Sequence, residues 1–212
     1  MIAAVVPVKD LAHSKSRLRL RFSDDEVERL ATAMLQDVVE ALCRVASLGR
    51  VVVATPDEKV AEIARRAGAE ALVQNDSGLN PAVEAACRKV AGSRGDGVLV
   101  VLGDVAGIDP AEIERLLAAV DGPGVALAPS RDGGTAALLR IPHDVIPAGF
   151  GPDSAAVHRE RAERAGVRCV ALPLPSLGID VDDAADLAGV LASSAAARHT
   201  RAASRALGAS EP

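Results

Sequence analysis

The sequence predicts a single α/β domain with a mostly parallel central sheet and helices on both faces. Its 212 residues suit one hydrophobic core. The chain is 49% apolar and 25% charged, which allows a substantial core beneath a hydrated surface. Short apolar runs alternate with segments of helical periodicity, the order that places parallel strands between helices. We expect the domain to span residues 1–192 and an Ala-, Arg- and Ser-rich tail to span 193–212.

The first elements follow from apolar runs and helix caps. Residues 2–6 form an apolar run that Pro7 ends, which predicts a buried strand. Ser23 and Glu26 have the spacing of a capping box, and the apolar residues after them predict a helix of about 20 residues. The β-branched run at 51–54 predicts a second strand.

The later elements alternate in the same way. Thr55 is expected to cap a helix that has Pro56 in its first turn and that ends at Gly68. A further helix is expected to open at Asn80, and another is expected to be capped by Asp109. The remaining expected strands are 71–73, 98–102, 125–128, 136–140 and 167–172, and the helices are 80–90, 109–120, 154–165 and 182–196.

Composition excludes several classes of function. The formal charge is −5, and aromatic residues make up 1% of the chain, with no Trp or Tyr. Nucleic-acid binders usually carry a basic face or stacking aromatics, so we expect no nucleic-acid partner. Cys43, Cys87 and Cys169 lie far apart, which argues against a zinc site or a disulfide framework and favours the cytoplasm. The apolar run before Pro7 is too short for a signal peptide or a membrane span, so we expect no membrane association.

A cluster of cations follows the first expected strand. Lys9, Lys15 and Arg17 lie in one loop of an otherwise acidic chain. Ligands of parallel sheets bind beyond the carboxyl ends of the strands, and cations there suit an anionic ligand such as a triphosphate. The alternative is a solvated basic loop. The loop has neither the P-loop pattern nor the dinucleotide-binding glycine pattern.

Acidic residues follow two other strands. Asp104 ends the most hydrophobic strand, and Mg²⁺ prefers one or two carboxylates together with phosphate oxygens. Asp180 and Asp182 alternate with apolar residues and therefore share one side of the chain, whereas Asp183 resembles a helix cap. The alternative is that these carboxylates only cap turns and helices.

A glycine pair and a helix start mark a further candidate site. Gly133 and Gly134 would let a ligand approach the backbone closely. Ser154 would begin a helix, and a helix N-terminus favours an anion. The alternative is a hairpin turn followed by an ordinary helix cap.

Taken together, these segments resemble one enzyme family. They are Pro7-Val-Lys9, Lys15-Ser-Arg17-Leu18, Gly78-Leu-Asn80, Gly103-Asp104, Arg131-Asp-Gly-Gly-Thr135, Phe150-Gly-Pro-Asp-Ser154 and Ile179-Asp-Val-Asp182. Over residues 2–190 the chain resembles the 2-phospho-L-lactate/phosphoenolpyruvate guanylyltransferases, which make the deazaflavin coenzyme F420. Phe-Gly-Pro-Asp-Ser after Arg-Asp-Gly-Gly-Thr is the specific part of the pattern.

The resemblance implies a Rossmann-like nucleotidyltransferase fold, GTP as a substrate and magnesium as the cofactor. It also implies roles for the matching residues. These are Asp104 and Asp180 for the metal, Lys15 facing the triphosphate, and Thr135, Gly151 and Ser154 for a phosphorylated three-carbon acid.

Two positions depart from the family pattern. The family usually has Asp-Leu-Pro-Leu where this chain has Asp104-Val-Ala-Gly107. It usually has Gly-Gly-Thr-Asn where this chain has Gly-Gly-Thr135-Ala136. The amide missing at Ala136 bears on acceptor preference and removes no metal ligand.

The expected reaction joins GMP from GTP to the acid and releases pyrophosphate. The acceptor phosphate, with a second pKa of about 6, is largely dianionic at neutral pH and needs no general base. The metal and the basic loop would neutralise the repulsion between two polyanions. The expected nucleotide-binding residues are Lys9, Lys15, Arg17 and Asn80, with Asn80 and the backbone of residues 6–8 reading guanine.

The sequence leaves the acceptor open among phosphoenolpyruvate, 2-phospho-L-lactate and 3-phospho-D-glycerate. The Ala- and Arg-rich composition is typical of a GC-rich bacterial genome and favours phosphoenolpyruvate. Three other functions stay open: a molybdopterin or sugar-phosphate nucleotidyltransferase, a non-catalytic GTP-binding domain, and an α/β interaction module. A homodimer is also open.

Overall fold

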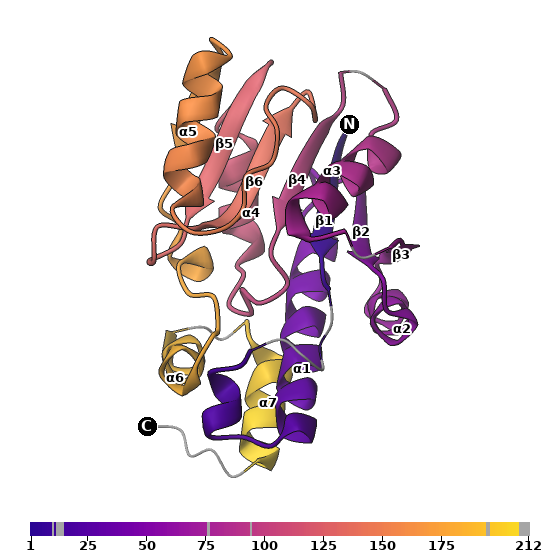
Figure 1. Ribbon diagram of the computed structural model, residues 1–212, viewed down its shortest axis with the longest axis vertical. Coiled ribbons are helices and arrows are strands. Elements are labelled where there is room, and N and C mark those ends of the chain that lie inside the picture. Colours follow the sequence, from indigo (N-terminus) through magenta and orange to yellow (C-terminus); the bar gives the residue numbers. More distant parts are fainter. Residues whose placement is uncertain (10, 12–14, 76, 94, 194–195, 208–212) are drawn as a thin grey trace.

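One mixed sheet forms the centre of the molecule (Figure 1). The computed structural model describes residues 1–9, 11, 15–75, 77–93, 95–193 and 196–207. In these residues seven strands lie in the order β3-β2-β1-β4-β6-β5-β7. β6 is antiparallel to both of its neighbours, and the other adjacent strands pair in parallel. The predicted α/β architecture with a mostly parallel sheet is therefore confirmed.

The observed elements match the expected order, with small shifts at their ends. The strands are β1 Ile2–Pro7, β2 Arg50–Thr55, β3 Glu70–Val73, β4 Gly97–Val101, β5 Gly124–Pro129, β6 Thr135–Ile141 and β7 Arg168–Ala171. The α-helices are α1 Asp24–Cys43, α2 Glu58–Arg66, α3 Leu79–Val90, α4 Pro110–Leu117, α5 Ser154–Arg164, α6 Ala184–Ser193 and α7 Arg198–Ala206. Two short 3₁₀ helices, Leu18–Leu20 and Pro175–Leu177, complete the list.

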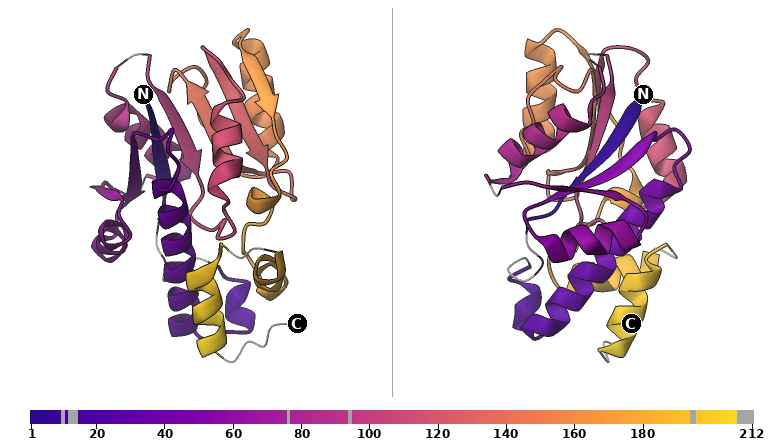
Figure 2. Two further views of the ribbon diagram at one scale, coloured as in Figure 1. Left: turned by 180° about the vertical axis from the view of Figure 1, so that it is seen from behind. Right: turned by 90° about the vertical axis from the view of Figure 1, so that its right-hand side faces the viewer.

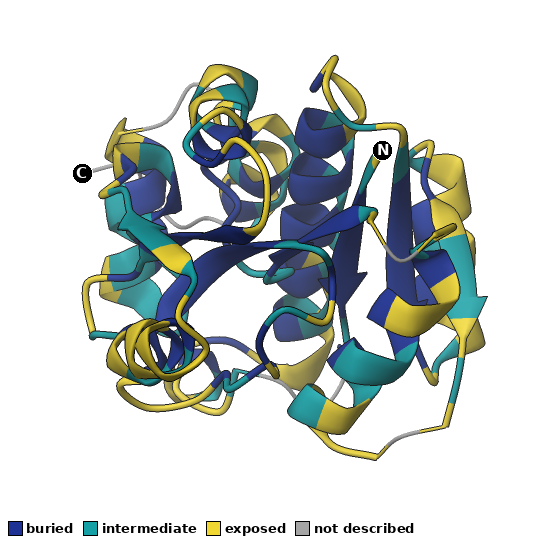
Figure 3. Ribbon diagram, turned by 90° about the horizontal axis from the view of Figure 1, so that it is seen from above, coloured by how far each residue is buried: buried dark blue, intermediate teal, exposed yellow. Residues whose placement is uncertain are grey.

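The strands divide two hydrophobic cores by simple alternation. In β1, Ala4 and Val6 join the core beneath α1, α2 and α4, whereas Ala3 and Val5 join the core beneath α3 and α5. The helices accordingly cover both faces of the sheet (Figure 2). Figure 3 shows the same layering as buried strands surrounded by helices whose outer surfaces are exposed. Burial on both faces explains why the strands read as nearly continuous apolar runs.

One expected cap is wrong. Asp57, not Thr55, is the N-cap of α2, and its carboxylate accepts from the backbone N–H of Lys59 at 2.8 Å. Thr55 is buried as the last residue of β2, and its hydroxyl accepts from the backbone N–H of Asp57 at 3.1 Å. The strand therefore extends further than expected, and Pro56 lies before the cap rather than inside the helix.

The C-terminal segment also differs from the tail expected at 193–212. Helix α7 lies along α1 (Figure 1). Asp37 of α1, itself buried, accepts from the backbone N–H groups of His199 and Thr200 and from the Thr200 hydroxyl. A side chain on another helix thus supplies the cap of α7, which no local pattern could indicate. Residues 194–195 and 208–212 lie outside the described residues.

The strand directions bring distant segments to one edge of the sheet. The parallel strands β1 and β4 end at the same edge, and β6 begins there because it runs the opposite way. The backbone N–H of Leu102, just after β4, donates to the carbonyl of Ala136, next to Thr135. None of the described helices is long and apolar enough to cross a membrane.

Candidate functional site

A buried lysine joins two of the acidic segments at this edge. Lys15 Nζ lies 2.5 Å from Asp104 Oδ2 and 2.8 Å from Asp182 Oδ1. Its side chain is only 8% exposed. Burial alone would lower the pKa of Lys15, but the charges and hydrogen bonds of the two carboxylates outweigh burial and raise it. Lys15 is therefore a fixed cation, held away from bulk water.

The strand-end loops place these carboxylates beside one another. The backbone N–H of Val181 donates to the carbonyl of Asp104 at 3.2 Å, which ties the 178–182 segment to the end of β4. Burial raises the pKa of Asp180, and the nearby charges of Asp104, Asp132 and Asp182 raise it further. Asp183 accepts from the backbone N–H groups of residues 185 and 186, so it caps the following helix as expected.

Asp104 has one carboxylate oxygen without a partner. Oδ1 is buried and makes no hydrogen bond in the part of the chain that the structure describes. A buried, unpaired carboxylate oxygen is costly, and a cation would offset that cost. Across the described ranges no three His, Cys, Asp or Glu groups converge on a single metal position. A small cation here would thus be shared between one or two carboxylates and a ligand, as Mg²⁺ usually is.

The other cations predicted for the nucleotide lie around the end of β1. Lys9 lines two small cavities, of about 140 and 70 Å³, on either side of this strand end. Lys15 lines the larger one together with Asp104, and Thr55 and Gln74 line the smaller one. Arg17 is exposed and precedes the first 3₁₀ helix. Residues 12–14 of the basic loop lie outside the described residues.

Asn80, which the sequence predicts to read guanine, has its side-chain amide hydrogen-bonded within the protein. Its Nδ2 donates to the carbonyl of Phe150 at 2.9 Å, and its Oδ1 accepts from the N–H of Phe150 at 2.7 Å. Both polar atoms of the amide therefore bond to the backbone of Phe150 and hold the loop before α5 in place. The backbone N–H of Val8, another expected contact for guanine, donates to the carbonyl of Ala54.

Thr135, Gly151 and Ser154 come together across 19 residues of sequence. Ser154 Oγ donates to Thr135 Oγ1 at 3.1 Å, and both residues are buried. Gly151 is exposed, with φ +139°, and a Cβ there would meet nothing within 4 Å. Its backbone faces open space, as approach by a ligand requires.

The helix cap at this site differs from the expected one. The N-cap of α5 is Asp153, in a left-handed conformation, and Ser154 is the first helical residue. The backbone N–H groups of Ser154 and Ala155 already donate to the carbonyls of Gly151 and Gly133. These two helix-end amides are already engaged, so the hydroxyl groups rather than the amides remain for an anion.

His158 adds a third side chain to the hydroxyl pair. Its Nδ1 lies 3.1 Å from Thr135 Oγ1, and its Nε2 accepts from the backbone N–H of Gly149 at 3.0 Å. The ring is fully buried and meets Phe150 edge-on, with ring centres 5.2 Å apart. The loop from Gly149 to Gly151 is thus held from one side by His158 and from the other by Asn80.

A buried ion pair supports the same loop from below. Arg140 of β6 is fully buried and donates to Glu84 Oε1 at 2.7 Å and to the carbonyl of Ile146 at 2.8 Å. Glu84 Oε1 also accepts from the backbone N–H of Ala148 at 2.6 Å. The loop therefore begins on a charged cluster with little freedom to move.

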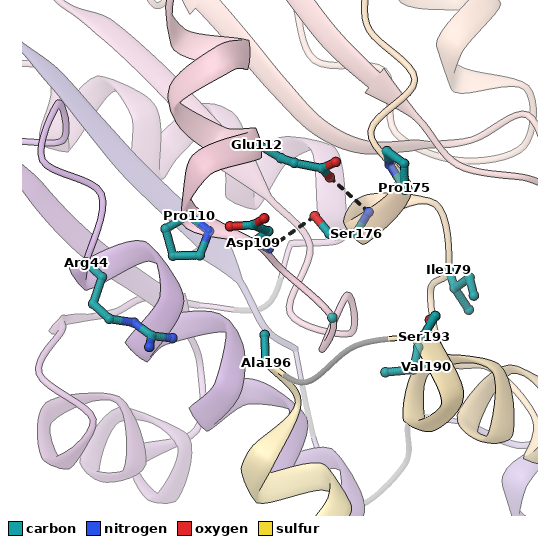
Figure 4. A pocket seen from close by; sticks show the side chains of 11 residues that line it. Arg44, Asp109, Pro110, Glu112, Pro175, Ser176, Ile179, Val190, Ser193 and Ala196 are labelled. Carbon is teal, nitrogen blue, oxygen red and sulfur yellow. Dashed lines mark hydrogen bonds between the residues drawn. The ribbon is translucent and has the colours of Figure 1, made fainter.

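A larger cavity is lined by other residues (Figure 4). It has a volume of about 440 Å³ and lies among α4, the second 3₁₀ helix and α6. Its two acidic residues contact Ser176: Glu112 accepts from the Ser176 N–H, and the Asp109 N–H donates to the Ser176 hydroxyl. It contains none of the residues predicted for catalysis or binding.

Sequence reasoning missed two residues of the site. Asp182 was set apart from the metal pair, yet it shares Lys15 with Asp104. Its alternation with Asp180 was a usable signal, because both side chains fall on the same side of the segment. His158 was one of four scattered histidines, and no local pattern distinguishes it.

Comparison with known sequences finds one matching family model and several similar proteins. The sequence model of the family described as "Guanylyl transferase CofC like" matches residues 2–210. A phosphoenolpyruvate guanylyltransferase of Sphaerobacter thermophilus is 38% identical over 185 residues, which cover 87% of this chain and 89% of the relative. A 3-phospho-D-glycerate guanylyltransferase of Colwellia psychrerythraea is 34% identical over 184 residues, covering 86% and 88%.

Comparison with solved structures supports the fold. A protein of Desulfovibrio desulfuricans, named as a nucleotide-diphospho-sugar transferase, superposes with a TM-score of 0.75. The match covers 97% of this chain and 96% of that one, at 20% sequence identity. This similarity supports the fold alone.

Proposed function

The chain belongs to the CofC-like guanylyl transferase family, and from that membership we propose that it transfers GMP from GTP to phosphoenolpyruvate. The chain is a nucleotidyltransferase whose relatives are named for phosphorylated three-carbon acids. The relative from Sphaerobacter thermophilus is named for phosphoenolpyruvate, which agrees with the composition argument. The product would serve biosynthesis of the deazaflavin coenzyme F420, in the cytoplasm, where three unpaired thiols are stable.

One observation carries the proposal: two sites of different chemistry share one sheet edge. The charged cluster of Lys15, Asp104 and Asp182 suits a triphosphate with a cation. The hydroxyl pair of Thr135 and Ser154 suits the anionic group of an acid. The antiparallel course of β6 places the two sites side by side, which the transfer of a nucleotidyl group between two polyanions requires.

The residues at the charged cluster fit a divalent cation. Asp104 offers a buried, unpaired oxygen, and the pKa of Asp180 is raised by burial and by the charges of neighbouring carboxylates. We assign the metal to Asp104 and Asp180, with Asp182 joined to Asp104 through Lys15. Magnesium held there would neutralise phosphate charge and orient the α-phosphate.

The protein residues would divide the remaining work. Lys15, which is only 8% exposed, would exchange one carboxylate for a phosphate oxygen of GTP. Lys9 and Arg17 extend the positive charge toward the pyrophosphate that leaves. Thr135, Ser154 and the backbone at Gly151 would orient the acid so that its phosphate oxygen attacks the α-phosphorus. That phosphate is ionised at neutral pH, so the site needs no general base.

Pyrophosphate release tests the proposal directly. The purified chain is incubated with GTP, Mg²⁺ and, in turn, phosphoenolpyruvate, 2-phospho-L-lactate or 3-phospho-D-glycerate. We expect phosphoenolpyruvate to give the highest kcat/KM and ATP in place of GTP to give little product. Release with 3-phospho-D-glycerate alone would overturn the acceptor, and release with no acid would overturn the function.

A further inference from the structure

The two ring nitrogens of His158 meet partners of opposite character. A backbone N–H can only donate a hydrogen bond, so His158 Nε2, which receives that of Gly149, must be unprotonated. Burial, together with the charges of Arg161 and Arg140, lowers the pKa of His158 to about 4. The ring is neutral at pH 7, and its single proton must therefore lie on Nδ1.

This tautomer sets the direction of the hydrogen bond to Thr135. Nδ1–H donates to Thr135 Oγ1, which also accepts from the hydroxyl of Ser154. Both lone pairs of Thr135 Oγ1 are then used, and the proton of its own hydroxyl is directed away from both neighbours. If both hydroxyls rotate so that Thr135 donates to Ser154, the proton without a partner lies on Ser154 instead. The pair still has one hydroxyl proton free to donate to a ligand.

The opposite tautomer would reverse the character of the site. Thr135 would donate to a bare Nδ1, and Ser154 would donate to Thr135, so both hydroxyl protons would be used inside the network. Only lone pairs would then face a ligand, and lone pairs repel an anion. A single proton on a buried ring therefore decides whether this wall donates or accepts.

We propose that His158 is a positioning residue that makes the Thr135–Ser154 pair a hydrogen-bond donor to the anionic group of the acceptor acid. The proposal rests on the proposed function, which places the acid at this wall. The same ring also fixes Gly149, which precedes the exposed backbone of Gly151 by two residues. His158 thus couples the hydroxyl pair to the loop that carries Gly151.

The tautomer can be measured without any activity. Nitrogen chemical shifts of ¹⁵N-histidine-labelled protein distinguish a protonated ring nitrogen from a bare one. We expect His158 at pH 7 to show a protonated Nδ1 and an unprotonated Nε2, with His158→Asn used to assign its signals. A ring protonated on Nε2, or on both nitrogens, would overturn the proposal.

Two substitutions separate the two ends of the ring. In His158→Asn the amide occupies the place of Nδ1, so its NH₂ group still donates to Thr135. In His158→Gln the amide reaches the place of Nε2, so it serves Gly149 and leaves Thr135 without a donor. We expect the acceptor KM to rise about tenfold or more in His158→Gln and to recover to within about threefold in His158→Asn.

Controls distinguish positioning from a general loss of structure. The GTP KM and the melting temperature are expected to change similarly in both variants, since each loses one buried hydrogen bond. His199→Gln, on α7 against Glu40, is the matched remote substitution and should leave both KM values unchanged. An equal rise of the acceptor KM in His158→Asn and His158→Gln would assign His158 to packing alone and overturn the proposal.

A third variant separates this proposal from the one on which it rests. Thr135→Val removes the hydroxyl that His158 orients. If Thr135→Val leaves the acceptor KM unchanged, the acid binds elsewhere, and the proposed site fails along with the positioning role. If Thr135→Val raises it while His158→Gln does not, the site stands and only the role of His158 is overturned.

Discussion

The two ends of the candidate site are built on opposite principles. At the end of β4, Lys15 is held by Asp104 and Asp182 through charge. At the start of β6, the hydroxyls of Thr135 and Ser154 are held by neutral hydrogen bonds to a buried ring. The first region gathers the carboxylates of Asp104, Asp180 and Asp182 around Lys15, and the pKa of Asp180 is raised by burial and by the charges of its acidic neighbours. In the second region, the hydrogen bonds among Thr135, Ser154 and His158 leave one hydroxyl proton without a partner in the network.

The difference teaches how each region meets its ligand. A charged cluster with surplus carboxylates gains stability when a cation and phosphates arrive, so its ion pairs must be exchanged on binding. A neutral network already arranged to donate needs no such exchange and costs little reorganisation. Substitutions in the first region should therefore reduce turnover, and substitutions in the second should reduce acceptor affinity.

The largest effect is expected at Asp104. Asp104→Asn should lower kcat by about 100-fold or more, because it removes the negative charge that would hold the cation needed in the transition state. Steady-state kinetics at saturating GTP and Mg²⁺ measure the effect, and the melting temperature should hardly change. Asp121→Asn, on an exposed turn, is the neutral control. Near-normal kcat in Asp104→Asn would remove this residue from the metal site.

Asp182 tests how far the charged region extends. From sequence alone, Asp182→Asn is expected to cost much less than Asp104→Asn. Because Asp182 contacts Lys15 at 2.8 Å, we now expect Asp182→Asn to lower kcat by an intermediate factor, roughly tenfold to 50-fold. Equal rates for Asp182→Asn and wild type would show that Lys15 needs only Asp104.

Lys15→Ala should impair binding and chemistry together. The cation is expected to contact GTP more strongly as pyrophosphate leaves, so the GTP Kd should rise and kcat should fall, by about 30-fold in kcat/KM. Lys59→Ala, at an exposed position on α2, is the matched control and should be silent. Unchanged GTP binding and turnover in Lys15→Ala would return the loop to a solvated surface.

Ser154→Ala tests the neutral region with a smaller effect. Removing this hydroxyl takes away one of the two hydroxyls proposed to contact the acid and should raise the acceptor KM about tenfold, with the GTP KM unchanged. Ser154 is not the helix cap, so the loss of stability should stay below the cost of a lost cap, about 1 kcal/mol. Gly151→Val is a poorer probe, because φ +139° would strain any side chain there. An equal rise of both KM values in Ser154→Ala would mean that this wall is not specific to the acid.

The order and type of the elements were predictable because local patterns determine them. The capping box of Ser23 and Glu26 is present, with the Ser23 N–H donating to Glu26 at 2.8 Å. Gly68 has φ +98° just beyond α2, as expected of a glycine that ends a helix. The β-branched runs lie in the sheet, where helices cover both of their faces.

The parts that escaped prediction depend on contacts between distant segments. Helix α7 is capped by Asp37 from α1, and Asn80 pairs with the backbone of Phe150, 70 positions away. Lys15 meets Asp182 across 167 positions. The motifs named candidate residues that the fold brings to one sheet edge, but the partner of each charge is a property of that folded edge rather than of any spacing.

The smallest predicted effect concerns the proton on His158, which sharpens the contrast between the two regions. The folded pKa is lowered from 6.5 to about 4, so between these values the unfolded chain binds a proton that the folded chain does not. The stability due to the neutral ring is complete above pH 6.5 and is lost as the pH falls toward 4, by about 1 kcal/mol for each pH unit. The groups facing the ring are Arg161 on α5 and Arg140 on β6, the latter paired with Glu84 on α3.

Urea unfolding of wild type and His158→Asn at several pH values isolates this proton, because the difference between the two curves cancels every other titration. The difference should be constant above pH 6.5 and should shift steadily against the wild type as the pH falls below it. Acceptor binding should weaken over the acid end of the same range, since a doubly protonated ring would oppose the N–H of Gly149 and move the loop that carries Gly151. GTP binding at the charged cluster should follow the carboxylates there instead, with no break that His158→Asn removes. A stability difference that does not change from pH 7 to pH 4 would mean that His158 has the same pKa in the folded and the unfolded chain. The fold would then not keep the ring neutral, and the ring would not be a preset donor to Thr135.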